Sequence, residues 1–237
     1  MEATTFGSID TTERLREIQT DAAEKADTAG QFTEIFRADA MALLREGADA
    51  DLVHARIDVI ANATKDQTHI AIAKTDANVL GYAQVGGGDG GIVLSEQYFG
   101  AITTMDDAAQ MQHAGSHEQR HGEQALLNGG VVFRGDTVDV LHLYEGDAEL
   151  AANAEMAMAA TEHRDGQPDE VYAVGQNIAY AIQNVVGKDL WDEVLTETGD
   201  AGDLQRALDE AGEGEVTRRT DQAVREAEPL PEGVLAA

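Results

Sequence analysis

The sequence predicts an α+β fold in which helices flank one small sheet. Apolar residues recur at helical spacing before residue 63 and after residue 103, whereas a stretch of about thirty residues between them alternates as strands do. The chain has 237 residues, 43% of them hydrophobic, so it is long enough and apolar enough to bury a core. Only 5% are aromatic, so small and aliphatic side chains should fill much of that core.

Three N-terminal helices are predicted before the sheet. Asp10 is placed to cap the first, over residues 10–27, and Glu13 stands at the capping-box position three residues later. Apolar stripes at helical spacing predict the second helix over residues 31–47 and the third over residues 50–62.

Three strands are expected next, over residues 68–75, 79–87 and 90–99. The first alternates apolar and polar residues, and the other two are rich in β-prone side chains. A glycine-rich run, GGGDGG, predicts a tight turn before the third strand. The short connections predict a small, mostly antiparallel or mixed sheet.

One long helix is predicted after residue 103. Thr104 is placed to cap it, Asp106 and Asp107 lie in its positive first turn, and the glycine pair at 129–130 should end it. After a short strand, further C-terminal helices are predicted over residues 139–161, 169–186, 189–198 and 203–211.

Negative charge dominates the composition. Forty-five acidic residues stand against sixteen basic ones, for a formal net charge of −29. Such a chain repels itself at low ionic strength, and molar salt, with a screening length of about 3 Å, removes most of that penalty. Acid-rich, lysine-poor, alanine-rich chains are typical of extreme halophiles. Nucleic acid is excluded as a partner because no basic face is visible to neutralise phosphates.

Cysteine is absent, which excludes disulfides and thiolate metal sites. The first residues, MEATTFGSIDTTERLREIQ, contain neither a basic region followed by an apolar run nor a membrane-spanning segment. We therefore expect no membrane partner and a cytoplasmic location, in a high-salt cytoplasm, with release inside a virion left open.

The chemistry-bearing motif is HEQRH at residues 117–121. On a helix, His117 and His121 lie one turn apart on the same face, so both imidazoles can reach one ion. Glu118 lies about 100° around the axis, where a general base can take a proton from an activated water. Two histidines are too few for a catalytic zinc site, which usually has three protein ligands.

HEQRH followed by YEGDAEL (144–150) resembles the gluzincin branch of the zincin metallopeptidases. The resemblance implies that His117, His121 and Glu145 bind Zn²⁺ and that Glu118 is the general base. It also implies that Glu149, one turn beyond Glu145, supports a ligand histidine.

The resemblance implies a zincin-like fold and covers residues 68–162. On the basis of this resemblance, we expect an N-terminal helical region (1–66), a zincin-like metallopeptidase core (67–211) and a charged C-terminal arm (212–237). The strand at 92–99 takes the place of the zincin edge strand, which binds an extended peptide by strand addition.

The chain departs from the family pattern in two places. Arg120 is hard to bury on a helix whose neighbouring positions are usually uncharged in the family, and Tyr144 replaces the family's asparagine before the third ligand. No motif assigns a transition-state donor; the candidates are His163, Tyr172 and Tyr180.

Several alternatives stay open at the site itself. Glu149 or Glu155 could replace Glu145 as the third ligand, and His113 fits a surface or supporting role better than ligation. The whole motif also fits a solvated polar face of a helix.

Three functional classes follow. The first is a zinc-dependent metallopeptidase that hydrolyses peptide bonds in a peptide or protein substrate. The alternative is a structural subunit of a homo-oligomer or large assembly, such as a virion or shell component, with a zincin-like fold and little or no activity. A ferritin-like di-metal bundle is the third, but it needs a second Glu-x-x-His motif, which the chain lacks.

Overall fold

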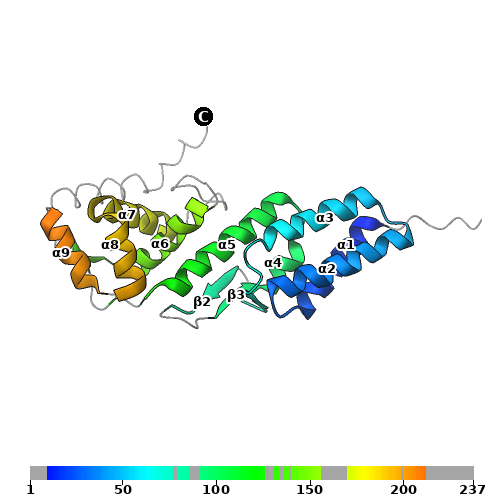
Figure 1. Cartoon of the computed structure of the whole chain (residues 1–237), viewed down its shortest axis with the longest axis horizontal. Coiled ribbons are helices and arrows are strands. Elements are labelled where there is room, and N and C mark those ends of the chain that lie inside the picture. The colour runs from blue at the N-terminus through cyan, green and yellow to red at the C-terminus, as the bar shows by residue number, and fades with distance from the viewer. Residues whose placement is uncertain are drawn as a thin grey trace, which may run out of the picture. The chain divides into compact units, whose positions relative to one another are not determined.

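The computed structural model describes residues 10–76, 79–85, 91–125, 127, 131–133, 136–138, 140–155, 170–198 and 200–211. They belong to two compact units, which Figure 1 shows with their elements labelled. Unit 1 comprises residues 1–83 and 91–118, and unit 2 comprises residues 84–90 and 119–237. Most described residues are helical and a small mixed sheet lies in unit 1, so the fold is α+β, as predicted.

Unit 1 begins with the three predicted helices, α1 (Thr11–Lys25), α2 (Ala29–Leu43) and α3 (Ala50–Ala63). The carboxylate of Asp10 accepts a hydrogen bond from the Glu13 amide at 3.1 Å, which confirms Asp10 as the cap of α1. A short 3₁₀ turn, η1 (Leu44–Glu46), extends α2 and ends at Gly47, whose φ of 92° lies in the left-handed region that favours glycine.

Phenylalanine and small residues fill the core of unit 1. The rings of Phe32 and Phe99 meet edge to face with centroids 5.1 Å apart. Buried alanines also belong to this core, as expected from the low aromatic content. The fully buried larger side chains of this core are Leu15, Phe32, Phe36, Leu43, Ile60, Ile70, Leu94, Phe99 and Ile102.

The sheet of unit 1 is mixed and contains β1 (Ala71–Ala73), β2 (Gly81–Ala83) and β3 (Ile92–Ser95). The order is β1-β3-β2, with β3 parallel to β1 and antiparallel to β2. The expectation that residues 92–99 form one edge strand is therefore wrong. Within the described sheet β3 is central and β2 has a single partner.

The chain after Ser95 is helical because of its packing. Residues of the predicted strand's second half form α4 (Glu96–Ala101), and this turn directs Phe99 into the core, where it is fully buried. A β-strand would have placed alternate side chains on opposite faces instead.

Helix α5 (Met105–Glu123) is the predicted motif helix. Thr104 Oγ1 accepts a hydrogen bond from the Asp107 amide at 3.1 Å, which confirms Thr104 as its cap. The Asp107 carboxylate accepts in return from the amides of Thr103 and Thr104 at 2.8 and 2.9 Å. Reciprocal bonding of this kind satisfies amides that a helix start leaves without partners.

Unit 2 contains a two-stranded antiparallel sheet and a set of helices. The strands are β4 (Val131–Phe133) and β5 (Asp136–Val138), and the predicted single strand is thus a hairpin. The helical elements are α6 (Val140–Glu155), α7 (Glu170–Val186), α8 (Lys188–Asp192), the π-helical segment η2 (Glu193–Thr198) and α9 (Ala201–Ala211).

The core of unit 2 is built around Trp191, which is fully buried. Its buried neighbours come from α6, α7, η2 and α9: Leu143, Ile178, Ala179, Ile182, Val194, Leu195, Leu204 and Leu208. The four predicted C-terminal helices are therefore found at the predicted places within the described residues. The predicted arm, residues 212–237, lies outside those residues, and the three predicted regions stay predictions.

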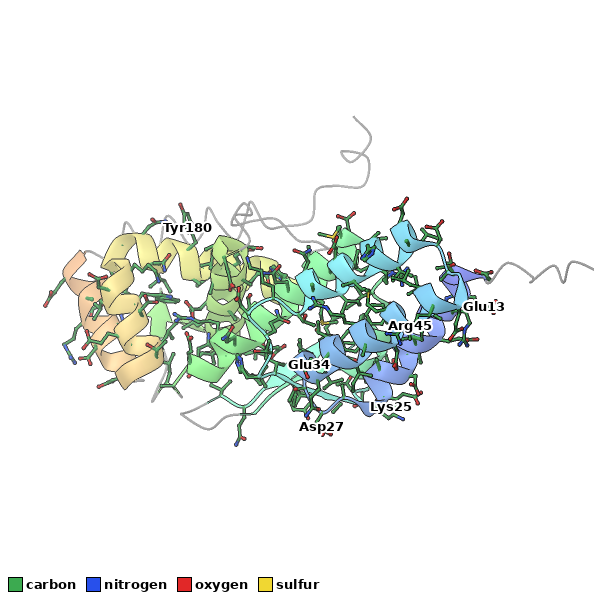
Figure 2. The ribbon with its side chains drawn as sticks, turned by 45° about the vertical axis from the view of Figure 1, so that its right-hand side comes forward. Glu13, Lys25, Asp27, Glu34, Arg45 and Tyr180 are labelled. Atoms are coloured by element: carbon green, nitrogen blue, oxygen red, sulfur yellow. The ribbon has the colours of Figure 1, made fainter. Side chains whose placement is uncertain are left out.

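Charged side chains cover the outside of the unit 1 helices. Figure 2 labels Glu13, Lys25, Asp27, Glu34 and Arg45 there, all of them exposed. Helices long and apolar enough for a membrane span are not found among the described residues.

The capping interaction at the start of α5 predicts a pH-dependent stability. Burial alone would raise the pKa of Asp107, but the bonds from Thr103 and Thr104 outweigh it and lower that pKa. The stabilisation should therefore be complete above the unfolded-state pKa, about 3.9, and be lost as the pH falls through the folded-state pKa. We expect Asp107→Asn to lower the free energy of unfolding by about 1 kcal/mol at pH 7.

Urea denaturation of both proteins at pH 7 and pH 3 checks this prediction. Asp58→Asn, at an exposed position of α3, is the matched control and should change little at either pH. An Asp107→Asn effect of equal size at the two pH values would contradict the assignment.

Candidate metal centre

Gly115 lets α5 pack closely against the side chain of Gln67 in unit 1. A Cβ added to Gly115 would lie 2.0 Å from Nε2 of Gln67, so only glycine lets that side chain lie against the helix. Gln67 Nε2 donates to the Gln112 carbonyl at 2.8 Å. The glycine before the motif therefore has a packing role. The apolar side chains that α5 adds to the core of unit 1 are Ala108, Met111 and Ala114.

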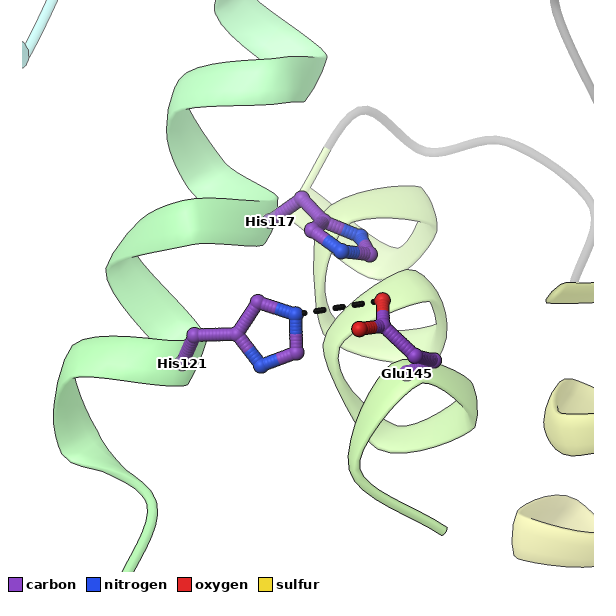
Figure 3. A group of neighbouring side chains, drawn as sticks. All are labelled: His117, His121 and Glu145. Atoms are coloured by element: carbon purple, nitrogen blue, oxygen red, sulfur yellow. Dashed lines mark hydrogen bonds and ion pairs between the residues drawn. The ribbon is translucent and has the colours of Figure 1, made fainter. Parts of the chain in front are cut away.

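The structure brings His117, His121 and Glu145 together (Figure 3). The histidines come from consecutive turns of α5 and the glutamate from α6. One potential ligand atom from each lies within 4.8 Å of the other two. Both histidines are 7% exposed, and Glu145 is half-buried. The dashed line marks His121 Nε2 and Glu145 Oε2, 3.2 Å apart.

The donor set fits a zinc ion. Zinc–nitrogen and zinc–oxygen bonds of about 2.0–2.2 Å at tetrahedral angles place neighbouring ligand atoms about 3.3–3.5 Å apart. The separation between His121 Nε2 and Glu145 Oε2 is close to that value, and the whole group lies within 4.8 Å. Two imidazoles and one carboxylate form a neutral-to-anionic, nitrogen–oxygen set of the kind that catalytic zinc sites use.

Glu118 lies beside strand β2. A Cβ added to Gly81 would be 3.1 Å from Cγ of Glu118 and 2.8 Å from the carbonyl oxygen of Val93. Glycine at position 81 therefore lets the strand and the Glu118 side chain approach each other. This contact joins the motif helix to β2, one of the two outer strands of the described three-stranded sheet.

A close contact between two helices positions Glu145. A Cβ added to Gly146 would lie 2.1 Å from the carbonyl carbon and oxygen of Gly175 on α7. No side chain fits there, so α6 and α7 approach each other through backbone atoms. Glu145 is the residue before this contact, and its backbone position is thereby set by the α6–α7 packing.

Gln124 forms a hydrogen bond to His121. Its Oε1 lies 2.7 Å from Nδ1 of His121, on the ring nitrogen that does not face Glu145. Its Nε2 donates to the carbonyl of Tyr144 at 2.9 Å and to the carboxylate of Asp147 at 3.1 Å. Gln124 is fully buried, so these bonds are shielded from water.

Arg120 is buried against carboxylates rather than exposed. It donates from Nε and Nη2 to the two oxygens of Asp147, at 2.7 and 3.2 Å, and from Nη2 to Asp192 at 2.8 Å. The Arg120 side chain is 13% exposed and that of Asp147 is 4% exposed. Trp191 Nε1 also donates to Asp147, at 2.6 Å. The arginine that looked hard to bury is accommodated by partners from α6 and α8.

The charges of this cluster reinforce one another. Burial lowers the pKa of Arg120, but the bonds to Asp147 and Asp192 outweigh it and raise that pKa, so the guanidinium stays charged. Burial would raise the pKa of Asp192, whereas Lys188 and Arg120 lower it overall.

The hydroxyl group of Tyr144 is hydrogen-bonded to backbone groups just after α5. It donates to the carbonyl of Ala125 at 2.6 Å and accepts from the amide of Leu127. Burial raises the pKa of Tyr144, which keeps the phenol protonated and able to donate. Tyr144 thus binds the backbone of two residues that follow α5, Ala125 and Leu127.

The remaining predicted residues lie near or apart from this group. Glu149 is buried on α6 one turn beyond Glu145, Glu155 is exposed at the end of that helix, and His113 is half-buried on α5. Tyr180 is half exposed on α7. Their proposed roles stay predictions. His163 and the side chain of Tyr172 lie outside the described part of the chain.

Comparison with family models, with curated proteins and with solved structures finds no match in any of the three. The resemblance to zincins therefore rests on the sequence motifs.

Sequence reasoning missed the polar residues that support the ligands. Gln124 follows His121 at a spacing of three, which places both on one side of a helix end, and this signal was available. Asp147 and Trp191 had no such signal, because Asp147 contacts Arg120 from 27 residues away in sequence and Trp191 contacts Asp147 from 44 residues away.

The α6–α7 contact predicts a specific sensitivity to added volume. Gly146→Ala places a methyl group against backbone atoms that cannot rotate away, so we expect the free energy of unfolding to fall by about 1–3 kcal/mol. Urea denaturation in molar salt measures the change. Gly100→Ala in α4 is the matched control, because its Cβ would meet only Thr20 at an ordinary 3.9 Å. Equal stability of the two variants would contradict the close contact.

Proposed function

We propose that this chain is a zinc-dependent metallopeptidase of the zincin type. The observation that carries the proposal is the convergence of His117, His121 and Glu145, whose ligand atoms lie within 4.8 Å of one another. Two of them share a helical turn spacing, and the third lies 24 residues beyond His121 on a different helix. A merely solvated helix face would not bury both imidazoles beside a carboxylate.

Three protein ligands leave the fourth position of a tetrahedral zinc site to water or substrate. A zinc ion held there supplies Lewis-acid chemistry, because it polarises a carbonyl group and makes a water molecule more acidic. His117 and His121 provide neutral nitrogen donors, and Glu145 provides one negative charge.

Glu118 supplies the proton transfer. It follows His117 directly on α5, so its side chain leaves the helix about 100° around the axis from that of His117 and would flank a bound ion without coordinating it. There it takes a proton from the attacking water and returns it to the departing amine. Strand β2, against which Glu118 packs, offers main-chain groups for an extended peptide on its side away from β3.

The zinc proposal predicts about one zinc ion per chain after purification in molar salt. His121→Ala should lose that zinc, because it removes a nitrogen ligand and leaves two donors. His54→Ala, an exposed histidine on α3, is the matched control and should keep it. Elemental analysis with a protein concentration measured in parallel checks both. No zinc in the unaltered chain would refute the proposal and favour the structural-subunit alternative.

The peptidase proposal predicts that Glu118→Gln lowers kcat by roughly 10²–10⁴-fold while zinc content stays unchanged. The amide keeps the size of the side chain but cannot accept the proton. Cleavage of a mixed peptide library, followed by mass spectrometry, measures the activity. Glu123→Gln, an exposed glutamate one turn later on α5, serves as the control. Equal cleavage by the Glu118→Gln variant would exclude Glu118 as the base.

A further inference from the structure

The buried side-chain amide of Gln124 is hydrogen-bonded to Nδ1 of His121. Gln124 lies at the end of α5 with no exposed surface, and its side chain makes three hydrogen bonds. All of its partners belong to unit 2, namely His121, Tyr144 and Asp147. An amide has a donor end and an acceptor end, so the identity of the partners fixes which way it points.

Two of the three partners accept hydrogen bonds only. The Tyr144 carbonyl has no proton to give. Both oxygens of Asp147 already accept hydrogen bonds, from Arg120 and Trp191, so Asp147 presents an acceptor oxygen to Gln124. The NH₂ group of Gln124 must therefore face Tyr144 and Asp147, and Oε1 must face His121.

The orientation of the amide determines the tautomer of His121. Because Oε1 of Gln124 accepts at 2.7 Å, Nδ1 of His121 must carry the proton. In the neutral ring the other nitrogen, Nε2, then presents a lone pair toward Glu145 Oε2 at 3.2 Å. Two acceptors facing each other at that distance repel unless a proton or a metal cation lies between them.

We infer that Gln124 is a positioning residue that holds His121 as its Nδ1–H tautomer, oriented so that Nε2 and Glu145 together receive a divalent cation. Asp147 and Arg120 anchor Gln124 in that orientation. This inference rests on the proposed zinc function and adds the group that prepares one ligand for it. Supporting groups of this kind typically change metal affinity by 10–100-fold when they are removed.

The test compares the full chain with Gln124→Met, which keeps the length of the side chain and removes its hydrogen bonds. Gln19→Met is the matched control, since Gln19 is an equally buried amide in unit 1 that donates to the carbonyls of Phe99 and Ile102. Two-bond ¹H–¹⁵N spectra of metal-free protein, at a pH where the ring is neutral, report the tautomer. Loss of a signal in His121→Ala assigns it.

The spectra should show Nδ1–H for His121 in the unaltered chain and in Gln19→Met. In Gln124→Met the Nε2–H form should appear, because Glu145 then accepts that proton. Zinc affinity, measured by chelator competition with zinc alone, should fall about 10–100-fold in Gln124→Met and stay unchanged in Gln19→Met. The tautomer of His121 in the unaltered chain tests the inference by itself, so the test does not depend on a Gln124→Met protein that folds.

The outcomes separate this inference from the proposed function. Nε2–H in the unaltered chain, or Nδ1–H retained in a folded Gln124→Met protein, would overturn the role of Gln124 whether or not zinc binds. Nδ1–H in the unaltered chain together with no zinc binding would uphold the positioning role and refute the zinc proposal.

Discussion

The buried carboxylate of Asp147 is the interaction on which the candidate site depends. It accepts from Arg120, Trp191 and Gln124, and these residues lie on or next to α5, α6 and α8. Burying a carboxylate is costly unless its oxygens accept hydrogen bonds, so the burial of Asp147 requires all three of these donors. The cluster therefore fixes the end of α5 against α6, and with it the distance between His121 and Glu145.

The positions of the three clustered residues have two different origins, the repeat of a single helix and the packing of one helix against another. The spacing of four residues along α5 puts His117 and His121 on one face without any tertiary interaction. Glu145 reaches the same place only because α6 is held by its neighbours, through the backbone contact of Gly146 with Gly175. The pair of candidate histidine ligands is thus encoded locally, whereas the position of Glu145 depends on the folding of unit 2.

The same division explains what the sequence could predict. The helices, their caps at Asp10 and Thr104, and the paired histidines follow from local patterns and were found where expected, except that α5 ends at Glu123 and not at the glycine pair 129–130. The order of the strands could not be predicted from local patterns, because packing determines which strands are neighbours. The helical turn after Ser95 likewise arises from the burial of Phe99. The ion pairs of Arg120 could not be predicted from local patterns either, since its partners Asp147 and Asp192 lie 27 and 72 residues away in sequence.

Burial of Arg120 has a consequence for a chain with a net charge of −29. Exposed ion pairs such as that of Arg14 with Glu17 weaken as salt concentration rises, because mobile ions screen them. The pair of Arg120 with Asp147 is shielded from those ions by the surrounding protein. Ion pairs at the surface of the molecule therefore depend on salt concentration, whereas the pair of Arg120 with Asp147 depends on it little. An acidic protein can change the ionic strength it tolerates by substitution at its surface while the frame around these histidines stays the same.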